Sequence, residues 1–418
     1  MSLQATTIIR VGDDYFTFVN NYRANGEVIQ KMQPIKRQTI TDDYGREFLR
    51  TVPKFQMFCN VPDNDGSVRI PPYLYNLYTP LNHRLKSGKW KWTEILLRHV
   101  FGDQYELGLD YIQLIYQQPL QILPVLCLVS KENQTGKTTF LNWLKMIFRE
   151  NVIIIGNQEI SSQFNFMYGY KLIIGIEESR IERSTVQEKI KAMATQKEVV
   201  MNEKFQRAHT VDYFGKIILL SNHEDSFISA NKEDIRYWIR KIPVISKQNE
   251  NYNIEDDLQA EVPAFLHFIS SRKLSTTKQS RAWFNPDQLE TDALNRVREY
   301  SHTPLYFDLK EALTQYFAAN EHEQQLKGTA KHLLDLINDT LQRNVQYNTK
   351  YLTKVLRDEF EKQPVFGRFT EMRFNWNSQP GSFYVFDREE FVNLPQENGF
   401  VNENFVYKQA EKQSILPF

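Results

Sequence analysis

The sequence has few cysteines, no long apolar run and no net charge. Cys59 and Cys127 are the only cysteines among 418 residues, which argues against a disulfide framework or a cysteine-ligated zinc site and is typical of a reducing cytosol. No segment approaches the ~20 apolar residues that span a membrane, and the first residues lack the layout of a signal peptide. The 51 basic and 51 acidic residues balance, so any surface that attracts nucleic acid must be local. We therefore expect a cytoplasmic protein with no membrane partner.

The chain is long enough for about two or three domains, and its 41% hydrophobic residues suffice for sizeable cores. Short extended runs predict a small β-rich module at 1–88, and helical spacing predicts a collar-like helical segment at 89–123. Strands alternate with helices at 124–271, which is typical of an α/β domain whose parallel sheet is covered on both faces. A polar stretch at 272–300 is expected to be a linker. At 301–418, three helices and a hairpin that turns at 379–381 have the order of a winged helix.

The most informative motif lies between a strand predicted at 125–129 and a helix predicted at 137–148, where the chain reads SKENQTGKTT. A Gly-Lys-Thr turn at a helix start is typical of a phosphate-binding loop, because backbone N–H groups and the positive helix end face the anion. Lys137 can reach the terminal phosphates, and Thr138 can offer its hydroxyl to Mg²⁺. We assign six residues to ATP binding: Asn133, Thr135, Gly136, Lys137, Thr138 and Thr139. Lys131 stands where the usual first glycine would be, and we expect Asn133 to take the left-handed conformation instead.

Polar residues follow two later strands, which are predicted at 171–176 and 216–221. Further strands are expected at 152–155 and 237–244, and a further helix is expected at 184–195. We expect Glu177 to hold Mg²⁺ and Glu178 to polarise the attacking water. Asn222 can hydrogen-bond the γ-phosphate or orient the water, the alternative being an ordinary turn-starting asparagine. Arg236 is the candidate for a finger that reaches a neighbouring subunit's γ-phosphate, with a structural salt bridge as the alternative and Arg240 as a competitor.

Two basic surfaces are candidates for DNA contact. The segment 199–211 reads as two short strands around a basic tip with Lys204, Arg207 and His209. On a helix predicted at 347–361, one face carries Lys350, Lys354 and Arg357, and in a winged helix this is the position of the recognition helix. In both places a solvated surface is the alternative.

The order and spacing of Gly136-Lys137-Thr138, Glu177-Glu178, the Lys204 hairpin, the strand ending at Asn222 and Arg236 resemble superfamily 3 helicases. These are the AAA+ replication helicases of viruses, phages and plasmids, and the helicase half of phage-type primase-helicases is most similar. The resemblance covers about residues 90–245. It implies an α/β P-loop NTPase core and a hexameric ring in the host bacterial cytoplasm that hydrolyses ATP between subunits, with Lys204 as the single-stranded DNA contact and Arg236 acting in trans.

This resemblance makes a replicative DNA helicase at a replication fork the primary hypothesis. No primase domain is recognisable, so priming is expected to need a separate primase. Two alternatives remain open. One is a P-loop ATPase that loads or remodels a nucleoprotein assembly without unwinding, and the other is a DNA-binding module with an inactive P-loop.

Overall fold

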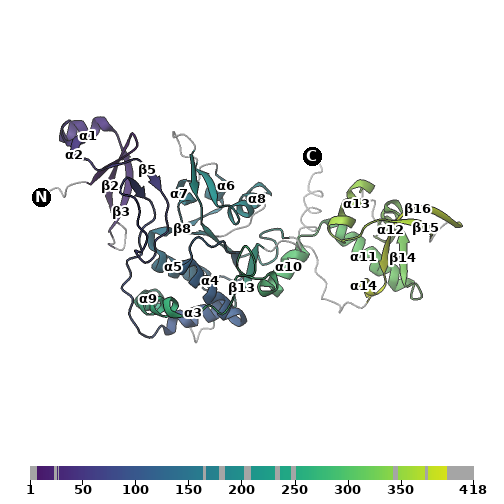
Figure 1. Cartoon of the computed structure of the whole chain (residues 1–418). Coiled ribbons are helices and arrows are strands. Elements are labelled where there is room, and N and C mark those ends of the chain that lie inside the picture. The colour runs from purple at the N-terminus through teal and green to yellow at the C-terminus, as the bar shows by residue number, and fades with distance from the viewer. Residues whose placement is uncertain are drawn as a thin grey trace, which may run out of the picture. The chain divides into compact units, whose positions relative to one another are not determined.

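The computed structural model describes residues 7–22, 26, 28–162, 166–177, 184–201, 209–230, 236–245, 251–341, 347–371 and 375–392. The chain divides into two compact units, Met1–Ser301 and His302–Phe418 (Figure 1). None of the helices in the described ranges has the length and apolarity needed to cross a bilayer.

The first unit begins with a small β module. Its four-stranded sheet has the order β3-β2-β1-β4, from β1 (Ile8–Val11), β2 (Asp14–Tyr22), β3 (Val28–Ile35) and β4 (Lys54–Phe55). Ile8 packs with Ile40 and Val52 on the face that α1 (Arg37–Tyr44) and α2 (Phe48–Thr51) cover, whereas Ile9 and Phe16 pack on the other. The parallel pair β5 (Met57–Cys59) and β6 (Leu74–Asn76) follows. Strands thus make up most of the regular structure in this segment.

The centre of the first unit is a five-stranded parallel sheet with the order β13-β7-β12-β9-β8. The strands are β7 (Val125–Val129), β8 (Val152–Ile155), β9 (Ile173–Ile176), β12 (Lys216–Ser221) and β13 (Tyr237–Lys241). Three of them match the predicted bounds, and β9 and β13 are shorter than predicted. Every residue of β7 and β12 is buried because helices cover both faces.

Alternate side chains of the sheet enter two different cores. Leu126, Leu128 and Trp238 pack on the face covered by α3 (Lys91–Phe101), α4 (Tyr105–Gln117), α5 (Lys137–Phe148) and α9 (Ile254–Ser271). Cys127 and Ile239 pack on the face of α6 (Asn157–Ser161), α7 (Phe166–Gly169), α8 (Ser184–Met193) and α10 (Asp292–Tyr300). Short 3-10 turns η1 (Gly102–Gln104), η2 (Arg149–Asn151) and η4 (Pro286–Leu289) connect some of these elements. The predicted helical pattern from residue 90 to 116 is therefore confirmed as α3 and α4.

An antiparallel pair, β10 (Glu198–Met201) and β11 (His209–Asp212), accounts for the two short strands predicted around a basic tip. The connecting residues 202–208 lie outside the described residues.

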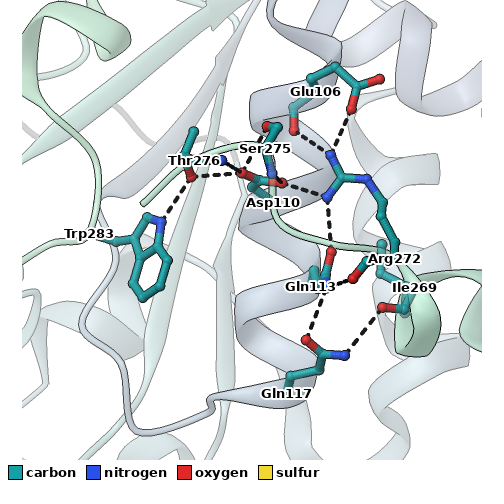
Figure 2. Close-up of polar contacts among 9 residues, drawn as sticks. All are labelled: Glu106, Asp110, Gln113, Gln117, Ile269, Arg272, Ser275, Thr276 and Trp283. Carbon is teal, nitrogen blue, oxygen red and sulfur yellow. Dashed lines mark hydrogen bonds and ion pairs between the residues drawn. The ribbon is translucent and has the colours of Figure 1, made fainter. Parts of the chain in front are cut away.

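The segment 272–300, which we expected to be a polar linker, belongs to the first unit and buries Phe284, Leu289 and Leu294 in its cores. A polar cluster fastens it to α4 (Figure 2). Asp110, which is fully buried, accepts hydrogen bonds from Arg272 Nη1 (2.5 Å) and from the backbone and hydroxyl groups of Ser275 and Thr276 (2.7–3.0 Å). The linker prediction was wrong because the composition of a polar segment does not reveal that some of its polar residues are buried and paired with one another.

The second unit contains α11 (Pro304–Ala319), β14 (Gln325–Gly328), α12 (Ala330–Leu341), α13 (Thr349–Asp358), β15 (Val365–Glu371), β16 (Asn375–Asp387) and α14 (Glu389–Val392). Its antiparallel sheet has the order β14-β16-β15. The three predicted helices are confirmed. The turn predicted at 379–381 is wrong, because β16 continues through it and Gly381 pairs with Gly367. Pro380 lies where β16 has β15 as its only described neighbour, and such an edge tolerates the missing N–H.

Candidate nucleotide-binding site

A cavity of about 230 Å³ opens where the carboxyl ends of β7, β12 and β9 meet. Because β12 lies between β7 and β9, residues that follow these three strands are brought to one edge of the sheet. The cavity is lined by Asn133, Gln134, Thr135, Gly136, Lys137, Thr138, Thr139, Glu177, Leu220, Ser221 and Asn222. The structure thus brings together all six residues assigned to ATP binding, together with Glu177 and Asn222.

The loop between β7 and α5 holds Lys137 in a buried position at the first residue of α5. Its ammonium group donates to the carbonyl oxygens of Ser130 (3.2 Å) and Glu132 (3.4 Å). Burial lowers the pKa of Lys137 below its ordinary value, although the charges of Glu224 and Glu132 oppose this shift. The lysine is thus held beside the cavity by neutral carbonyl groups, which a phosphate can replace as its partner.

The loop achieves its tight turn with residues other than the predicted one. Gln134 has φ 57° and Gly136 has φ 84°, whereas Asn133 is not in the left-handed region. The expectation for Asn133 was therefore wrong. A Cβ at Gly136 would lie 3.5 Å from Ile245 Cδ1, so the glycine is needed for its conformation rather than for space. Asn133 instead contributes its side-chain oxygen, which accepts from Asn222 Nδ2 at 3.4 Å.

Two oxygen atoms in the cavity lining are buried and have no hydrogen-bond partner within the described part of the chain: Thr135 Oγ1 and Glu177 Oε1. A buried polar atom without a partner is costly, so such atoms commonly mark a ligand that supplies the partner. Glu177 directly follows β9, and its carboxylate suits Mg²⁺, which prefers oxygen ligands. In the described ranges no three metal-ligating side chains cluster, so a Mg²⁺ ion here would depend on phosphate oxygens as well. Glu178 lies outside the described residues.

Two residues that shape this loop were not predicted from the sequence. His99, on α3, shares a hydrogen bond of 2.9 Å between its Nε2 and the Thr135 carbonyl. Glu224, which is 5% exposed, accepts from the Lys131 backbone N–H (3.2 Å) and pairs with Lys241 Nζ (2.9 Å). Burial alone would raise the pKa of Glu224, but these partners outweigh it and the pKa lies below its ordinary value. Both residues are far from the loop in sequence, so no local pattern could have revealed them.

Residues 128–240 match a family of unknown function (DUF5906). The chain is also similar in structure to the apo form of the NrS-1 C-terminal region (305–718), with a TM-score of 0.63 and 14% identity over 91% of this chain and 96% of that one. The A-form apo structure of the same region gives 0.61 and 14% over 92% and 96%. At this identity the likeness shows a shared fold. A structure described as SCCmec type IV Cch, active helicase, covers 92% and 93% at 10% identity, but its TM-score of 0.37 supports no argument. No curated protein matches the sequence.

The two candidate arginine fingers differ in their surroundings. The Arg240 guanidinium is bound within its own chain by Gln104 Oε1 (2.8 Å), the Phe101 carbonyl (2.6 Å) and Asp103 (2.8 Å), and its side chain is 12% exposed. Arg236 lies at the opposite end of the strand, where its carbonyl accepts from the Val125 N–H at the start of β7. It is therefore distant from the cavity of its own chain.

The DNA-contact candidates are only partly described. Lys204 and Arg207 lie outside the described residues, and His209 belongs to β11 but its side chain is not among those described. In the second unit, Lys350, Lys354 and Arg357 are exposed on α13, and Arg357 pairs with the adjacent Asp358 at 2.6 Å. The other face of α13 is buried, through Leu352, Val355 and Leu356. The helix thus presents its basic face to solvent.

Proposed function

We propose that this chain is an ATP-dependent replicative DNA helicase of the phage or mobile-element type, which translocates on single-stranded DNA as a homo-oligomeric ring. The observation that carries the proposal is the cavity itself. It combines a buried lysine at a helix start, the Asn222 amide and a Glu177 oxygen that has no partner among the described residues, all at the ends of three adjacent parallel strands. The helicase assignment rests further on the motif order, which resembles superfamily 3 helicases.

In this proposal the loop amides and the Lys137 ammonium bind the β- and γ-phosphates of ATP. Lys137 exchanges the Ser130 and Glu132 carbonyls for phosphate oxygens, which are stronger partners because they are charged. Glu177 and the exposed Thr138 hydroxyl would hold Mg²⁺, which neutralises charge on the phosphates. Asn222 lies within reach of Asn133 across the cavity and would orient the γ-phosphate or the attacking water, with Glu178 as the polarising base.

The remaining residues would act between subunits and on DNA. Arg236 would complete a neighbour's site, and Lys204, Arg207 and His209 would grip single-stranded DNA in the ring. The exposed face of α13, as part of a winged-helix-like domain, would contact duplex DNA at the fork. A hexamer and a separate primase belong to the same proposal.

The test is unwinding of a forked DNA substrate with ATP and Mg²⁺, measured beside ATP turnover. Lys137→Ala should lower ATP affinity by about 10- to 150-fold, because a charged hydrogen bond contributes about 1.5–3 kcal/mol, and unwinding should stop with it. Lys145→Ala is the matched control, because this lysine is in α5 but does not line the cavity. Glu178→Gln should bind ATP and fail to hydrolyse it.

The outcomes separate the competing functions. DNA-stimulated turnover without strand displacement would replace the helicase by a remodelling ATPase. No turnover at all would leave a DNA-binding module with an inactive P-loop. Equal turnover by wild type and Lys137→Ala would overturn the site assignment.

A further inference from the structure

The phosphate-binding loop of this chain departs from the usual pattern at its first position, where Lys131 replaces a glycine. Lys131 does not adopt a left-handed conformation. The first residue of the loop therefore does not make the tight left-handed turn that a glycine allows, and another contact must hold its backbone in place. The hydrogen bond that fixes this residue comes from Glu224, whose Oε1 accepts from the Lys131 N–H at 3.2 Å.

Glu224 is placed to do this by the strand order. β7 lies between β12 and β13, and Glu224 follows β12 by three residues. Its second oxygen, Oε2, pairs at 2.9 Å with Nζ of Lys241, the last residue of β13, which is in register with Val129 at the end of β7. One carboxylate therefore connects the ends of three adjacent strands, with the phosphate loop at the centre.

The local surroundings favour a fixed geometry. The Glu224 side chain is 5% exposed, whereas that of Lys241 is 45% exposed, so the carboxylate is the more deeply buried partner. The turn that carries it is itself held by hydrogen bonds, from the His223 N–H to Ser221 Oγ (3.0 Å) and from the Ser130 N–H to the Ser221 carbonyl (3.2 Å). Charged hydrogen bonds to a backbone N–H are among the stronger ones in proteins.

We propose that Glu224, with Lys241 as its counter-ion, is a positioning residue that holds the first turn of the loop in its phosphate-binding shape. The inference rests on the proposed ATP site. Glu224 does not line the cavity, and it acts through the Lys131 backbone rather than by touching the nucleotide. The loop binds phosphates in the ground state and in the transition state alike. A loosened loop therefore weakens binding of both, which raises KM and leaves kcat nearly unchanged.

The experiment measures KM and kcat for ATP, together with the melting temperature, in the full-length protein. Glu224→Ala should raise KM about tenfold or more and change kcat less than about threefold, a loss equivalent to one charged hydrogen bond. Glu224→Gln keeps an acceptor for the Lys131 N–H and should show a smaller rise, and it serves if the alanine variant fails to fold. Lys241→Arg should keep the ion pair and behave as wild type. Glu290→Ala is the control, because its carboxylate pairs with Arg298 (2.7 Å) in the same unit away from the loop, and it should leave KM unchanged.

A purely structural role for Glu224 predicts a lower melting temperature with an unchanged KM, and this result in Glu224→Ala or Glu224→Gln would overturn the inference. The Lys137→Ala variant separates this failure from failure of the proposed function. If Lys137→Ala loses ATP turnover while both Glu224 variants keep the wild-type KM, only the positioning role is wrong. If Lys137→Ala turns over ATP like wild type, the ATP site itself is wrong.

Discussion

The two arginines at the ends of β13 give opposite predictions, which makes them the most direct test of the subunit-interface model. Arg240→Ala removes a guanidinium that donates to Gln104 Oε1, to the Phe101 carbonyl and to Asp103. The Asp103 carboxylate is 83% exposed, so its contribution is discounted for solvent screening. The other two bonds, at about 1.5 kcal/mol each, give a loss of about 3 kcal/mol in the free energy of unfolding.

For a unit of this length, about 3 kcal/mol corresponds to a fall in melting temperature of about 5 °C, at about 2.1 cal/mol/K of unfolding entropy per residue. Arg236→Ala should instead act on catalysis. It should reduce ATP turnover by about 10³-fold or more, because a finger in trans stabilises transition-state charge. ATP affinity should change little in either variant, since neither side chain lines the cavity.

Differential scanning fluorimetry and a coupled ATPase assay measure both quantities on the same preparations. Arg98→Ala is a suitable control, because Arg98 is 58% exposed and forms its ion pair with Glu94 on the surface of α3. Mixing Arg236→Ala with wild type should depress turnover more than dilution alone. The reasoning is refuted if Arg240→Ala melts like wild type and loses turnover while Arg236→Ala remains active.

Three further predictions concern the rest of the chain. Burial lowers the pKa of Lys216 to about 7; the unfolded chain then binds more protons above that pH, so stability should rise with pH from about 7 towards 10. Lys216→Met should reduce this rise, as measured by melting temperatures at both ends of the window, and an identical rise in the variant would count against it. Asp110→Ala should cost about 3–5 kcal/mol in denaturant unfolding, because it leaves the largely buried Arg272 without its closest partner; a loss below about 1 kcal/mol would show that the cluster in Figure 2 does not fasten the segment. Replacing Lys350 and Lys354 together by Gln should weaken duplex binding at every sequence and lower the salt slope by about 2, and unchanged binding would exclude α13 as the contact surface.

The α/β core was predictable because its strands are continuous apolar runs. Val125–Val129 and Lys216–Ser221 are buried on both faces, so their composition marks their bounds. The cavity lining was predictable for the same reason, since its residues directly follow those strands or begin the next helix. By contrast, β13 was predicted to run too far. Its last pairing is between Lys241 and Val129, but the apolar pattern of the sequence continues through residues 242–245.

What the sequence did not show depends on contacts between distant segments. Asp110 and Arg272 are polar residues that are buried because they satisfy one another, and composition made the segment after Arg272 look like a linker. Gln134 adopts a left-handed conformation that asparagine was expected to take, since the loop is held by contacts from His99 and Glu224 rather than by local preference. Pro380 and Gly381 suggested a turn, but pairing with β15 keeps both in β16.

The parallel strands set a further consequence. The cavity lies beyond the carboxyl end of β7, and Arg236 bonds to Val125 at its amino end, so a five-residue strand of about 16 Å separates them. A single chain cannot fold Arg236 back onto its own nucleotide without dismantling the sheet. In the proposed role, specific activity therefore depends on the protein concentration. On dilution, ATP turnover per chain should fall to a low residual rate, whereas nucleotide affinity should stay constant.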